Sequence, residues 1–401
     1  MGHAGLLTGI FLKKVIFRRK LSLKKEGGCI VYKILVLNFG GTSSKVAIYH
    51  DEKVIADETI RHSDEDMAKH PLAKHQLEYR KRLIQEWIES KGERVNGFDA
   101  IACIGAYAVG AYKSGTYIVD EAFKNELLSK FFPDIPLLHG TRLVLPIALE
   151  FTAEHNIPIY ITDPVSVDEL QLIAKISGFS EYNRVAGFQP LSHKAVARKH
   201  AAVLGKEYKD CRFIIAHLGS GISIGAHSGG RVIEVNDCGH GYGPFSPERA
   251  GTISARVMME ICFSGKYTQQ ELYNKIVTKS GIYAHLGTKD MREVERRINE
   301  GDKKAALVYE AMAYSIAKEI GQCFAVLSCN IDALIFTGGS AYSDMLMGLI
   351  RKYVGNLGPI AIYPGELENE ALALGAYRVL SGQEEPVRFG VNSGYEEQLE
   401  F

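Results

Sequence analysis

The fold of this 401-residue chain is decided by the stretch Ile214-Ile215-Ala216-His217-Leu218-Gly219-Ser220-Gly221-Ile222-Ser223-Ile224-Gly225. An apolar run typical of a buried strand meets a Gly/Ser-rich turn, and apolar residues then return at every second position. This pattern predicts a strand, a tight loop and a second strand. Because glycines let backbone N–H groups approach an anion closely and serines add hydroxyl donors, the loop is suited to hold a phosphate. An ordinary glycine hairpin without a ligand is the alternative.

Two familiar phosphate-binding loops are excluded by the spacing of the glycines. A dinucleotide fingerprint needs G-x-G-x-x-G at the start of a helix, whereas here the third glycine comes one residue late. The residues after the turn also have the period of a strand. The P-loop pattern G-x-x-x-x-G-K-[ST] does not occur in the sequence.

The same design occurs a second time near the start of the chain, in Ile34-Leu35-Val36-Leu37-Asn38-Phe39-Gly40-Gly41-Thr42-Ser43-Ser44-Lys45-Val46-Ala47-Ile48. In the alignment of the two copies, Asn38 matches His217, Gly40 matches Gly219, and Ser44 matches Ser223. Two copies far apart favour a duplicated domain, in which each half presents a phosphate-facing hairpin to a shared cleft. Chance similarity of two glycine hairpins is the alternative.

Composition indicates a globular chain long enough for two domains and without a strongly charged partner. Lys+Arg and Asp+Glu number 47 each, so no overall field attracts nucleic acid or an anionic membrane. The seven cysteines include no C-x-x-C pair, which is typical of a reduced cytosolic protein rather than a disulfide or zinc framework. No apolar run approaches the length of a bilayer span. We therefore expect a cytoplasmic protein with no nucleic-acid or membrane partner.

Residues 1–30 differ in composition from the rest of the chain. Mostly apolar residues at 6–12 are followed by seven Lys and Arg residues against a single acid, Glu26. A secretory signal has its charges before its apolar stretch, so the order excludes one. We favour the hypothesis that these residues are not translated. A ribosome-binding sequence such as AAGGAGG would be translated as Lys25-Glu26-Gly27, and the codon of Val31, a few codons later, could be a GTG start codon. A basic membrane-surface helix is the alternative.

Downstream, predicted strands alternate with predicted helices, which favours an α/β architecture. Besides the two hairpins, strands are predicted at 54–60, 98–105, 115–119, 158–163, 232–235, 333–337 and 360–363. Helices are predicted at 77–88, 141–155, 194–200, 303–326 and 369–376, and residues 381–401 are expected to form a loose polar tail.

Two further segments carry candidate ligand-binding groups. Arg249 lies between a Pro-rich turn and small residues in the glycine-rich segment 237–251, a position suited to an anion clamp. A rim arginine in a surface loop is the alternative. Gly338-Gly339-Ser340 follows a buried strand, and a double-glycine turn lets a base and ribose lie against the backbone. A plain strand-to-helix turn is the alternative there.

Together these segments resemble the acetate and butyrate kinases of the duplicated actin-like ATPase superfamily, with the strongest similarity to butyrate kinases. The resemblance covers about residues 33–380. Besides the Ala216-His217 hairpin, it rests on the runs Gly243-Pro244-Phe245-Ser246-Pro247-Glu248-Arg249, Cys262-Phe263-Ser264-Gly265-Lys266-Tyr267, Leu286-Gly287-Thr288, Tyr309-Glu310-Ala311-Met312-Ala313-Tyr314 and 370–376. It implies reversible phosphoryl transfer from ATP to butyrate, giving ADP and butyryl phosphate, with Mg²⁺ as cofactor.

The resemblance also implies an α/β fold of duplicated actin-like (ribonuclease H-like) domains that flank an interdomain cleft. Residues 31–164 are expected to form an acid-binding domain, completed by a helix at about 369–384. Residues 165–368 are expected to form a nucleotide-binding domain, followed by a polar tail at 385–401. Homologues of this kind imply a dimer or larger homo-oligomer.

The reaction accounts for the residue types that the family pattern assigns to the cleft. A carboxylate acceptor is ionised at neutral pH and needs no general base, so catalysis requires in-line geometry, a metal ion and donors around the phosphoryl group. The resemblance implies phosphoryl-stabilising roles for Arg249 and His217, with His139 beside them, and places Asp163, Glu370 and Asn38 in the magnesium and phosphate region. It assigns ATP to Asn38, Gly40, Ser44, Lys45, Gly219, Ser220, Gly221, Gly338, Gly339 and Ser340.

The sequence departs from the family pattern at three places. Gly105-Ala106-Tyr107-Ala108 stands where butyrate kinases have Gly-Arg-Gly-Gly, so an arginine expected to face the carboxylate or phosphoryl group is absent. Phe188-Gln189 replaces a Phe-His pair, and Phe39-Gly40-Gly41 replaces Pro-Gly-Ser. Lys113 and Arg142 are the candidate substitutes for the missing cation. Two alternatives stay open: a nucleotide-binding paralogue with weak or no kinase activity, and a kinase for another short or branched carboxylate.

Overall fold

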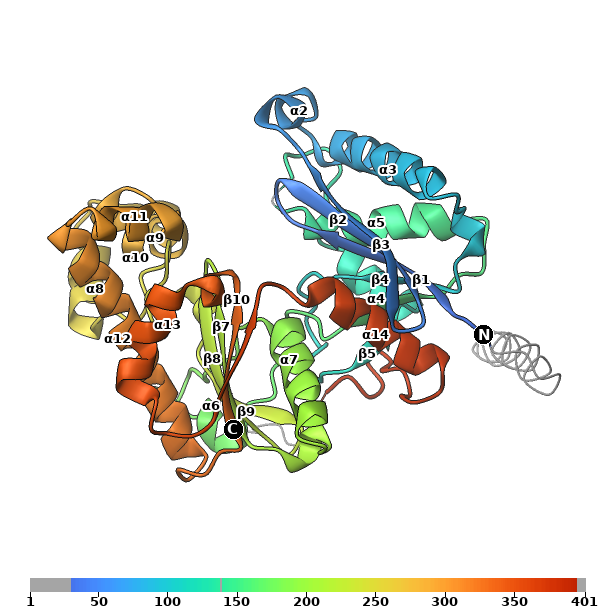
Figure 1. Cartoon of the computed structure of the whole chain (residues 1–401). Coiled ribbons are helices and arrows are strands. Elements are labelled where there is room, and N and C mark those ends of the chain that lie inside the picture. Colours follow the sequence, from blue (N-terminus) through green and yellow to red (C-terminus); the bar gives the residue numbers. More distant parts are fainter. Residues whose placement is uncertain (1–29, 138, 395–401) are drawn as a thin grey trace.

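The computed structural model describes residues 30–137 and 139–394. The hypothesis of an untranslated extension concerns residues 1–30, which lie outside this range except for residue 30. Within the range, the chain forms two lobes, each built around one β-sheet (Figure 1). None of the helices in these two ranges has the length and apolar character of a bilayer span.

The first lobe contains a six-stranded sheet in the order β3-β2-β1-β4-β6-β5. Its strands are β1 (Lys33–Phe39), β2 (Ser43–His50), β3 (Lys53–Arg61), β4 (Ala100–Cys103), β5 (Thr116–Ile118) and β6 (Ile159–Thr162). The first three form an antiparallel meander, and β4 and β6 extend the sheet parallel to β1. Strand β5 ends the sheet antiparallel to β6.

The second lobe contains a five-stranded sheet in the order β11-β10-β7-β8-β9. Its strands are β7 (Phe213–Leu218), β8 (Ile222–Ser228), β9 (Arg231–Val235), β10 (Ala333–Gly338) and β11 (Ile360–Pro364). Again three strands form an antiparallel meander, and β10 and β11 run parallel to the first of them. The order β9-β8-β7-β10-β11 therefore repeats β3-β2-β1-β4-β6. This repetition confirms the mixed α/β, duplicated architecture that the two hairpins predicted.

Both sheets are covered on both faces, which explains why their central strands read as continuous apolar runs rather than alternating ones. The covering helices are α3 (Ala73–Ser90), α5 (Thr141–Thr152) and α14 (Glu368–Leu380) in the first lobe, and α7 (Pro190–Val203), α12 (Lys303–Val326) and α13 (Asp344–Val354) in the second. Along β1, Leu35 and Leu37 pack with α3 and α5, whereas Ile34 and Val36 pack with α14. In the second lobe, Ile214 packs with α12 and α13 and Ile215 packs with α7.

The remaining helices lie at the edges of the two lobes. They are α2 (Asp64–Lys69), α4 (Glu121–Leu128), α6 (Leu172–Lys175), α8 (Ala255–Cys262), α9 (Gln269–Thr278), α10 (Gly281–Leu286) and α11 (Met291–Asn299). Short 3₁₀ turns are η1 (Val95–Gly97), η2 (Tyr208–Asp210), η3 (Cys238–His240) and η4 (Gly339–Tyr342). Helices α8 to α11 form a separate group beyond α12 (Figure 1).

Helix α3 begins four residues before the predicted start. Its N-cap, Leu72, makes no side-chain capping bond. Instead, the N–H groups of Ala73 and Lys74 donate to the carbonyls of Ile135 and Pro133, at 3.0 Å each. Because a distant segment satisfies the first turn, the sequence around residue 73 carries no start signal.

The loose tail expected from residue 381 onward is wrong for the residues that the structure describes. The backbone of Val387 exchanges hydrogen bonds with Thr116 and Ile118 on β5, at 2.9 and 3.1 Å. The ring of Phe389 stacks on Phe123 with centroids 5.2 Å apart. Polar composition suggested a tail, but these few apolar residues attach residues 385–394 to the first lobe.

Candidate active site

The two hairpin loops are built alike and have the same length. Gly40 N–H donates to Ser43 O at 2.9 Å in the β1–β2 loop, and Gly219 N–H donates to Gly221 O at 3.2 Å in the β7–β8 loop. The registers differ by one residue, because Phe39 lies opposite Ser44 whereas Leu218 lies opposite Ile222. Both loops thus present short glycine-containing segments between paired strands.

The aligned serines of the two hairpins face inward rather than toward a ligand. Ser44 Oγ lies 3.0 Å from His62 Nε2, and Ser223 Oγ lies 2.8 Å from His193 Nε2. Both serines are completely buried. The expectation that Ser44 contacts ATP is therefore corrected: its hydroxyl supports the hairpin from behind, and its neighbour Lys45 occupies the opposite face of β2.

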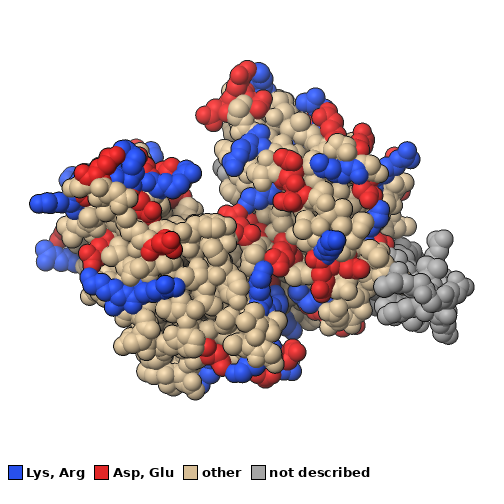
Figure 2. Space-filling model, in the orientation of Figure 1, with Lys and Arg blue, Asp and Glu red and all other residues tan. Residues whose placement is uncertain are grey.

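The segment after β11 joins the two hairpins. Gly365 exchanges two backbone hydrogen bonds with Gly338, at 3.0 and 3.1 Å. A few residues later, Glu366 pairs with Lys45, and Glu368 Oε2 accepts from Asn38 Nδ2 at 2.8 Å. The structure thereby brings Asn38, Lys45 and 366–370 together around a pocket of about 340 Å³. The space-filling view shows a notch between the two lobes (Figure 2).

His217 lies at the end of β7, with 8% of its surface exposed. Burial lowers its pKa to about 4, against the opposing charge of Glu366, so the imidazole is neutral at physiological pH. Its Nδ1 has no hydrogen-bond partner among the described residues. A buried ring nitrogen without a partner fits a ligand that would complete the site.

Arg249 lies directly against the second hairpin loop. A Cβ built on Gly221 would lie 2.3 Å from the nearer guanidinium nitrogen, so any other residue there would displace the guanidinium from its present position. The guanidinium donates to Cys238 O at 2.6 Å, and its Nε has no partner in the described chain. Ser246 couples the two segments, because its Oγ donates to Ser220 O and accepts from Arg249 N–H at 3.1 Å.

The double-glycine turn lies beside the same hairpin. Gly338 has a φ of +90°, and a Cβ there would lie 2.6 Å from Leu218 O. Gly339 is exposed, with open space where a side chain would stand, and Ser340 is half-buried. Thr337 pairs with His217 across β10 and β7. This turn leads into a 3₁₀ segment before α13, and its bare backbone fits a flat group such as a nucleoside.

Asp163 is held by protein groups rather than open to a ligand. It follows β6 with a φ of +42° and is 2% exposed. Its Oδ1 accepts from Gly115 N–H at 2.8 Å, and its Oδ2 pairs with Arg198 at 3.2 Å. Glu370 pairs with Lys199 at 3.5 Å, also from α7. A metal ion on Asp163 would have to displace Arg198.

His139 lies next to the first hairpin loop. A Cβ on its neighbour Gly140 would lie 1.9 Å from Gly40 O. The imidazole is near Thr141 Oγ1, at 3.0 Å. Partial desolvation lowers the pKa of His139, and the charges of Arg80 and Arg142 add to this effect.

The comparison with known families decides where the chain belongs. The sequence profile of the Acetokinase family matches residues 179–390, more than half of the chain. This chain belongs to the acetokinase family. Members of the family are carboxylate kinases that use ATP as a substrate, so the resemblance read from the sequence is confirmed at this level.

Solved structures agree with the duplicated actin-like fold. The acetate kinase from Porphyromonas gingivalis has a TM-score of 0.71 at 17% identity, covering 87% of this chain and 100% of that one. A propionate kinase from Francisella tularensis subsp. tularensis SCHU S4 has a TM-score of 0.63 at 19% identity, covering 86% and 98%. The acetate kinase from Entamoeba histolytica has a TM-score of 0.66 at 15% identity, covering 85% and 97%. At these identities the likeness is one of fold.

The place of the missing arginine is visible in this acetokinase. Ala106 and Tyr107 line a pocket of about 60 Å³ together with Lys130 and Arg142. Arg142 donates to Lys130 O at 2.7 Å, and Lys130 Nζ lies 5.4 Å from the Tyr107 ring centroid. Of the two candidate substitutes, Arg142 therefore lies beside the gap. The structure provides a cation there, carried by α5 instead of the expected loop.

Gln189, which replaces the family histidine, lies beneath the Arg249 loop. Its Oε1 accepts from Ser223 Oγ at 2.5 Å, and its Nε2 lies 3.5 Å from Cys238 Sγ. Since Arg249 donates to the carbonyl of Cys238, Gln189 is one contact away from the guanidinium. Gln189 therefore keeps a polar link in this part of the candidate site.

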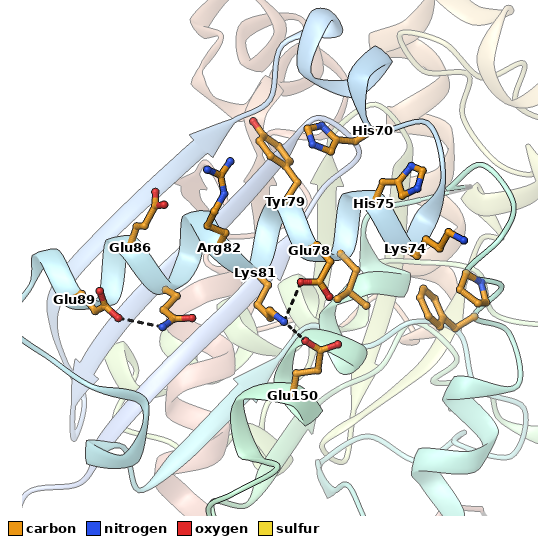
Figure 3. A pocket seen from close by; sticks show the side chains of 14 residues that line it. His70, Lys74, His75, Glu78, Tyr79, Lys81, Arg82, Glu86, Glu89 and Glu150 are labelled. Atoms are coloured by element: carbon orange, nitrogen blue, oxygen red, sulfur yellow. Dashed lines mark hydrogen bonds and ion pairs between the residues drawn. The ribbon is translucent and has the colours of Figure 1, made fainter.

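A separate hollow of about 1030 Å³ lies elsewhere, along the outer side of α3 (Figure 3). Charged side chains line it, and Lys81 pairs there with Glu78 and Glu150. Residues predicted for the acetokinase site do not take part in this groove. Since the candidate site residues gather at the hairpins instead, we assign the active site to the hairpin cleft.

Sequence reasoning missed a supporting residue, Arg80 on α3. It is completely buried, and its guanidinium donates to carbonyls of the first hairpin loop. The signal was present in the sequence: Arg80 lies four residues before Ile84 and seven before Trp87, on the apolar stripe of the predicted helix. A charged residue on the core-facing stripe of an amphipathic helix indicates a buried polar contact.

Proposed function

We propose that this acetokinase is a butyrate kinase that transfers the terminal phosphoryl group of ATP directly to the butyrate carboxylate. The observation that carries the proposal is the contact between Arg249 and Gly221, beside the unpartnered Nδ1 of His217. Guanidinium nitrogens and a neutral imidazole at a glycine loop are donors of the kind that stabilise a transferring phosphoryl group.

The proposed division of labour follows the two hairpins. Arg249 and His217 would hold the phosphoryl oxygens, while Gly338 and Gly339 would hold the nucleoside. Asn38, Lys45 and the first hairpin loop would meet the phosphates from the first lobe, which we also assign to the acid, and the second lobe we assign to the nucleoside. Lys45 from the first lobe and Arg249 from the second would stabilise charge on the transferring group.

Magnesium fits this site mainly through the nucleotide. Among residues 30–137 and 139–394, no three His, Cys, Asp or Glu side chains gather into a metal cage. Mg²⁺ commonly keeps several waters and is held by one or two carboxylates plus substrate phosphates, and Glu370 with the amide of Asn38 would supply that share. When bound, the ion neutralises charge that develops on the phosphates.

Butyrate rather than acetate is proposed because the sequence runs resemble butyrate kinases most strongly, whereas the altered acceptor wall keeps another short or branched acid as the alternative. Ala106 and Tyr107 replace an arginine, and Ile104 and Leu145 line the same pocket, so the wall is more apolar while Arg142 retains a cation. Two methylenes are worth about 1.6 kcal/mol, or roughly fifteenfold in selectivity. The preference is therefore measurable but modest.

The test is steady-state formation of acyl phosphate with Mg-ATP and acetate, propionate, butyrate, isobutyrate or valerate, with hydroxylamine trapping and parallel calorimetry of ATP binding. The highest kcat/KM with butyrate supports the proposal. A higher value with acetate or propionate contradicts the assigned acid and leaves the reaction type intact. ATP binding without turnover on any acid would instead support the nucleotide-binding paralogue, which the missing arginine favours. We also propose a homo-oligomer, to be checked by light scattering.

A further inference from the structure

The carbonyl groups of the first hairpin loop all turn toward the protein interior. Arg80 donates to Gly41 O at 2.7 Å, to Gly40 O at 3.2 Å and to Ser43 O at 3.3 Å. The carbonyl between them, that of Thr42, accepts from the backbone N–H of His62 at 2.9 Å. The four consecutive carbonyls of residues 40–43 therefore all accept hydrogen bonds from the protein, and the Arg80 side chain donates to three of them.

Two amide groups of the same loop are not bonded by the described residues. In the described chain, the N–H groups of Gly41 and Thr42 have no hydrogen-bond partner, and both residues are exposed. A Cβ on Gly41 would meet nothing within 4 Å, so the space in front of the loop is open. Successive free amides with their carbonyls turned away form a concave site for an anion.

The charge of Arg80 is placed behind this amide surface. The side chain is completely buried, and among the described residues it has no carboxylate partner; the side-chain oxygens that accept from it are Gln76 Oε1 at 3.2 Å and Ser44 Oγ at 3.5 Å. Burial lowers its pKa to about 10, so the guanidinium remains charged at neutral pH. A buried cation is costly unless it is compensated, and carbonyl dipoles compensate it only in part. An anion on the far side of the loop would add the missing compensation.

We propose that Arg80 is a positioning residue for phosphate binding: it fixes the Gly40–Ser43 carbonyls so that the Gly41 and Thr42 amides face a phosphate of ATP. The inference rests on the proposed function, because it takes the anion to belong to the nucleotide. Arg80 itself does not touch the ligand. It acts through the loop and through the positive charge that it holds behind the loop.

The experiment compares the binding of ATP and adenosine by calorimetry in wild-type protein and in Arg80→Gln. Adenosine carries the same base and ribose but no phosphate, so only ATP binding depends on the loop amides. We expect the Kd for ATP to rise at least about tenfold, the usual effect of losing charge-assisted hydrogen bonds. The Kd for adenosine should stay within about twofold. Arg82→Gln is the matched control on the same helix: Arg82 projects into the exposed groove (Figure 3) and should change neither value.

A milder variant covers the case in which Arg80→Gln does not fold. Gln76→Met keeps the side-chain volume and removes one acceptor of the guanidinium, and we expect a smaller rise in the ATP Kd in the same direction. Arg80→Lys keeps the charge without the fork and should fall between wild type and Arg80→Gln. The inference is overturned if ATP affinity is unchanged in these variants, or if ATP and adenosine lose affinity equally. Wild-type protein that does not bind ATP would overturn the proposed function instead, before any variant is compared.

Discussion

Replacing Gly221 by alanine should disable the phosphoryl site without touching its donors. The added Cβ would lie 2.3 Å from the nearer nitrogen of Arg249 and 2.7 Å from its Cζ. Ordinary contacts are near 3.5 Å, so the guanidinium must move by about 1 Å. Its hydrogen bond to Cys238 O, now 2.6 Å, limits that movement. A misplacement of about 1 Å typically costs about 100-fold in rate, so we expect kcat to fall by roughly that factor.

The assay is acyl phosphate formation from Mg-ATP and butyrate with hydroxylamine trapping. Gly348→Ala, on an exposed turn of α13 with open space around it, is the matched control and should retain wild-type kcat. The double variant Gly221→Ala/Arg249→Ala should be no slower than Arg249→Ala alone, because both changes act on one guanidinium. Normal kcat in Gly221→Ala, or a full additional loss in the double variant, would refute the reasoning.

Three further predictions follow from other parts of the molecule. Arg249→Ala should lower kcat by about 10²- to 10³-fold in the same assay, as expected for loss of a phosphoryl donor, whereas Arg256→Ala, whose side chain is 83% exposed on α8, should not. Burial lowers the pKa of His62 to about 4. Between about pH 6.5 and pH 4, His62 is therefore protonated in the unfolded chain but not in the folded one, so the free energy of unfolding decreases as the pH is lowered. When the pH is lowered from 7 to 5, the free energy of unfolding should decrease by about 2 kcal/mol less in His62→Gln than in the wild type, as measured by urea titration. An equal decrease in both proteins contradicts this prediction. Phe389→Ala should lower the free energy of unfolding by about 2 kcal/mol, because its ring stacks on Phe123. Val391→Ala, at a 79% exposed position, should change the free energy of unfolding by less than about 0.5 kcal/mol. Equal effects of the two variants would contradict the packing of residues 385–394 on the first lobe.

Much of the fold was predictable because its signals are local. The two hairpins were predicted from apolar runs that flank glycine turns. Helix α12 has the bounds Lys303–Val326 that the spacing of its apolar residues predicted. The first turn of α3 and the segment 385–394 were missed for the opposite reason. The first amides of α3 donate to the carbonyls of Pro133 and Ile135, and the segment 385–394 pairs with β5. In both cases the partner lies far away in the sequence.

The candidate site divides in the same way. The family resemblance implied that Arg249 and His217 act together, whereas the contact of Arg249 with the second hairpin loop is visible only in the structure. The bonds of Asp163 with Arg198 and of Asn38 with Glu368 join residues from distant segments, and sequence spacing carries no information about such pairs. Likewise, the packing of α5 places Arg142 beside Ala106 and Tyr107, where the family has an arginine, and the sequence spacing does not show this.

By itself, the sequence determined the duplicated hairpins and the α/β alternation. The tertiary structure decided which face of each hairpin meets the cleft. Alternation separates Ser44 from Lys45 along β2, but which of the two faces inward depends on the helices that cover the sheet. Packing α3 against the first sheet buries Ser44 and places Arg80 behind the loop, and the chain after β11 then brings Glu366 to Lys45. Side-chain period is a local property of the strand, whereas the burial of one face is a property of the assembled layers.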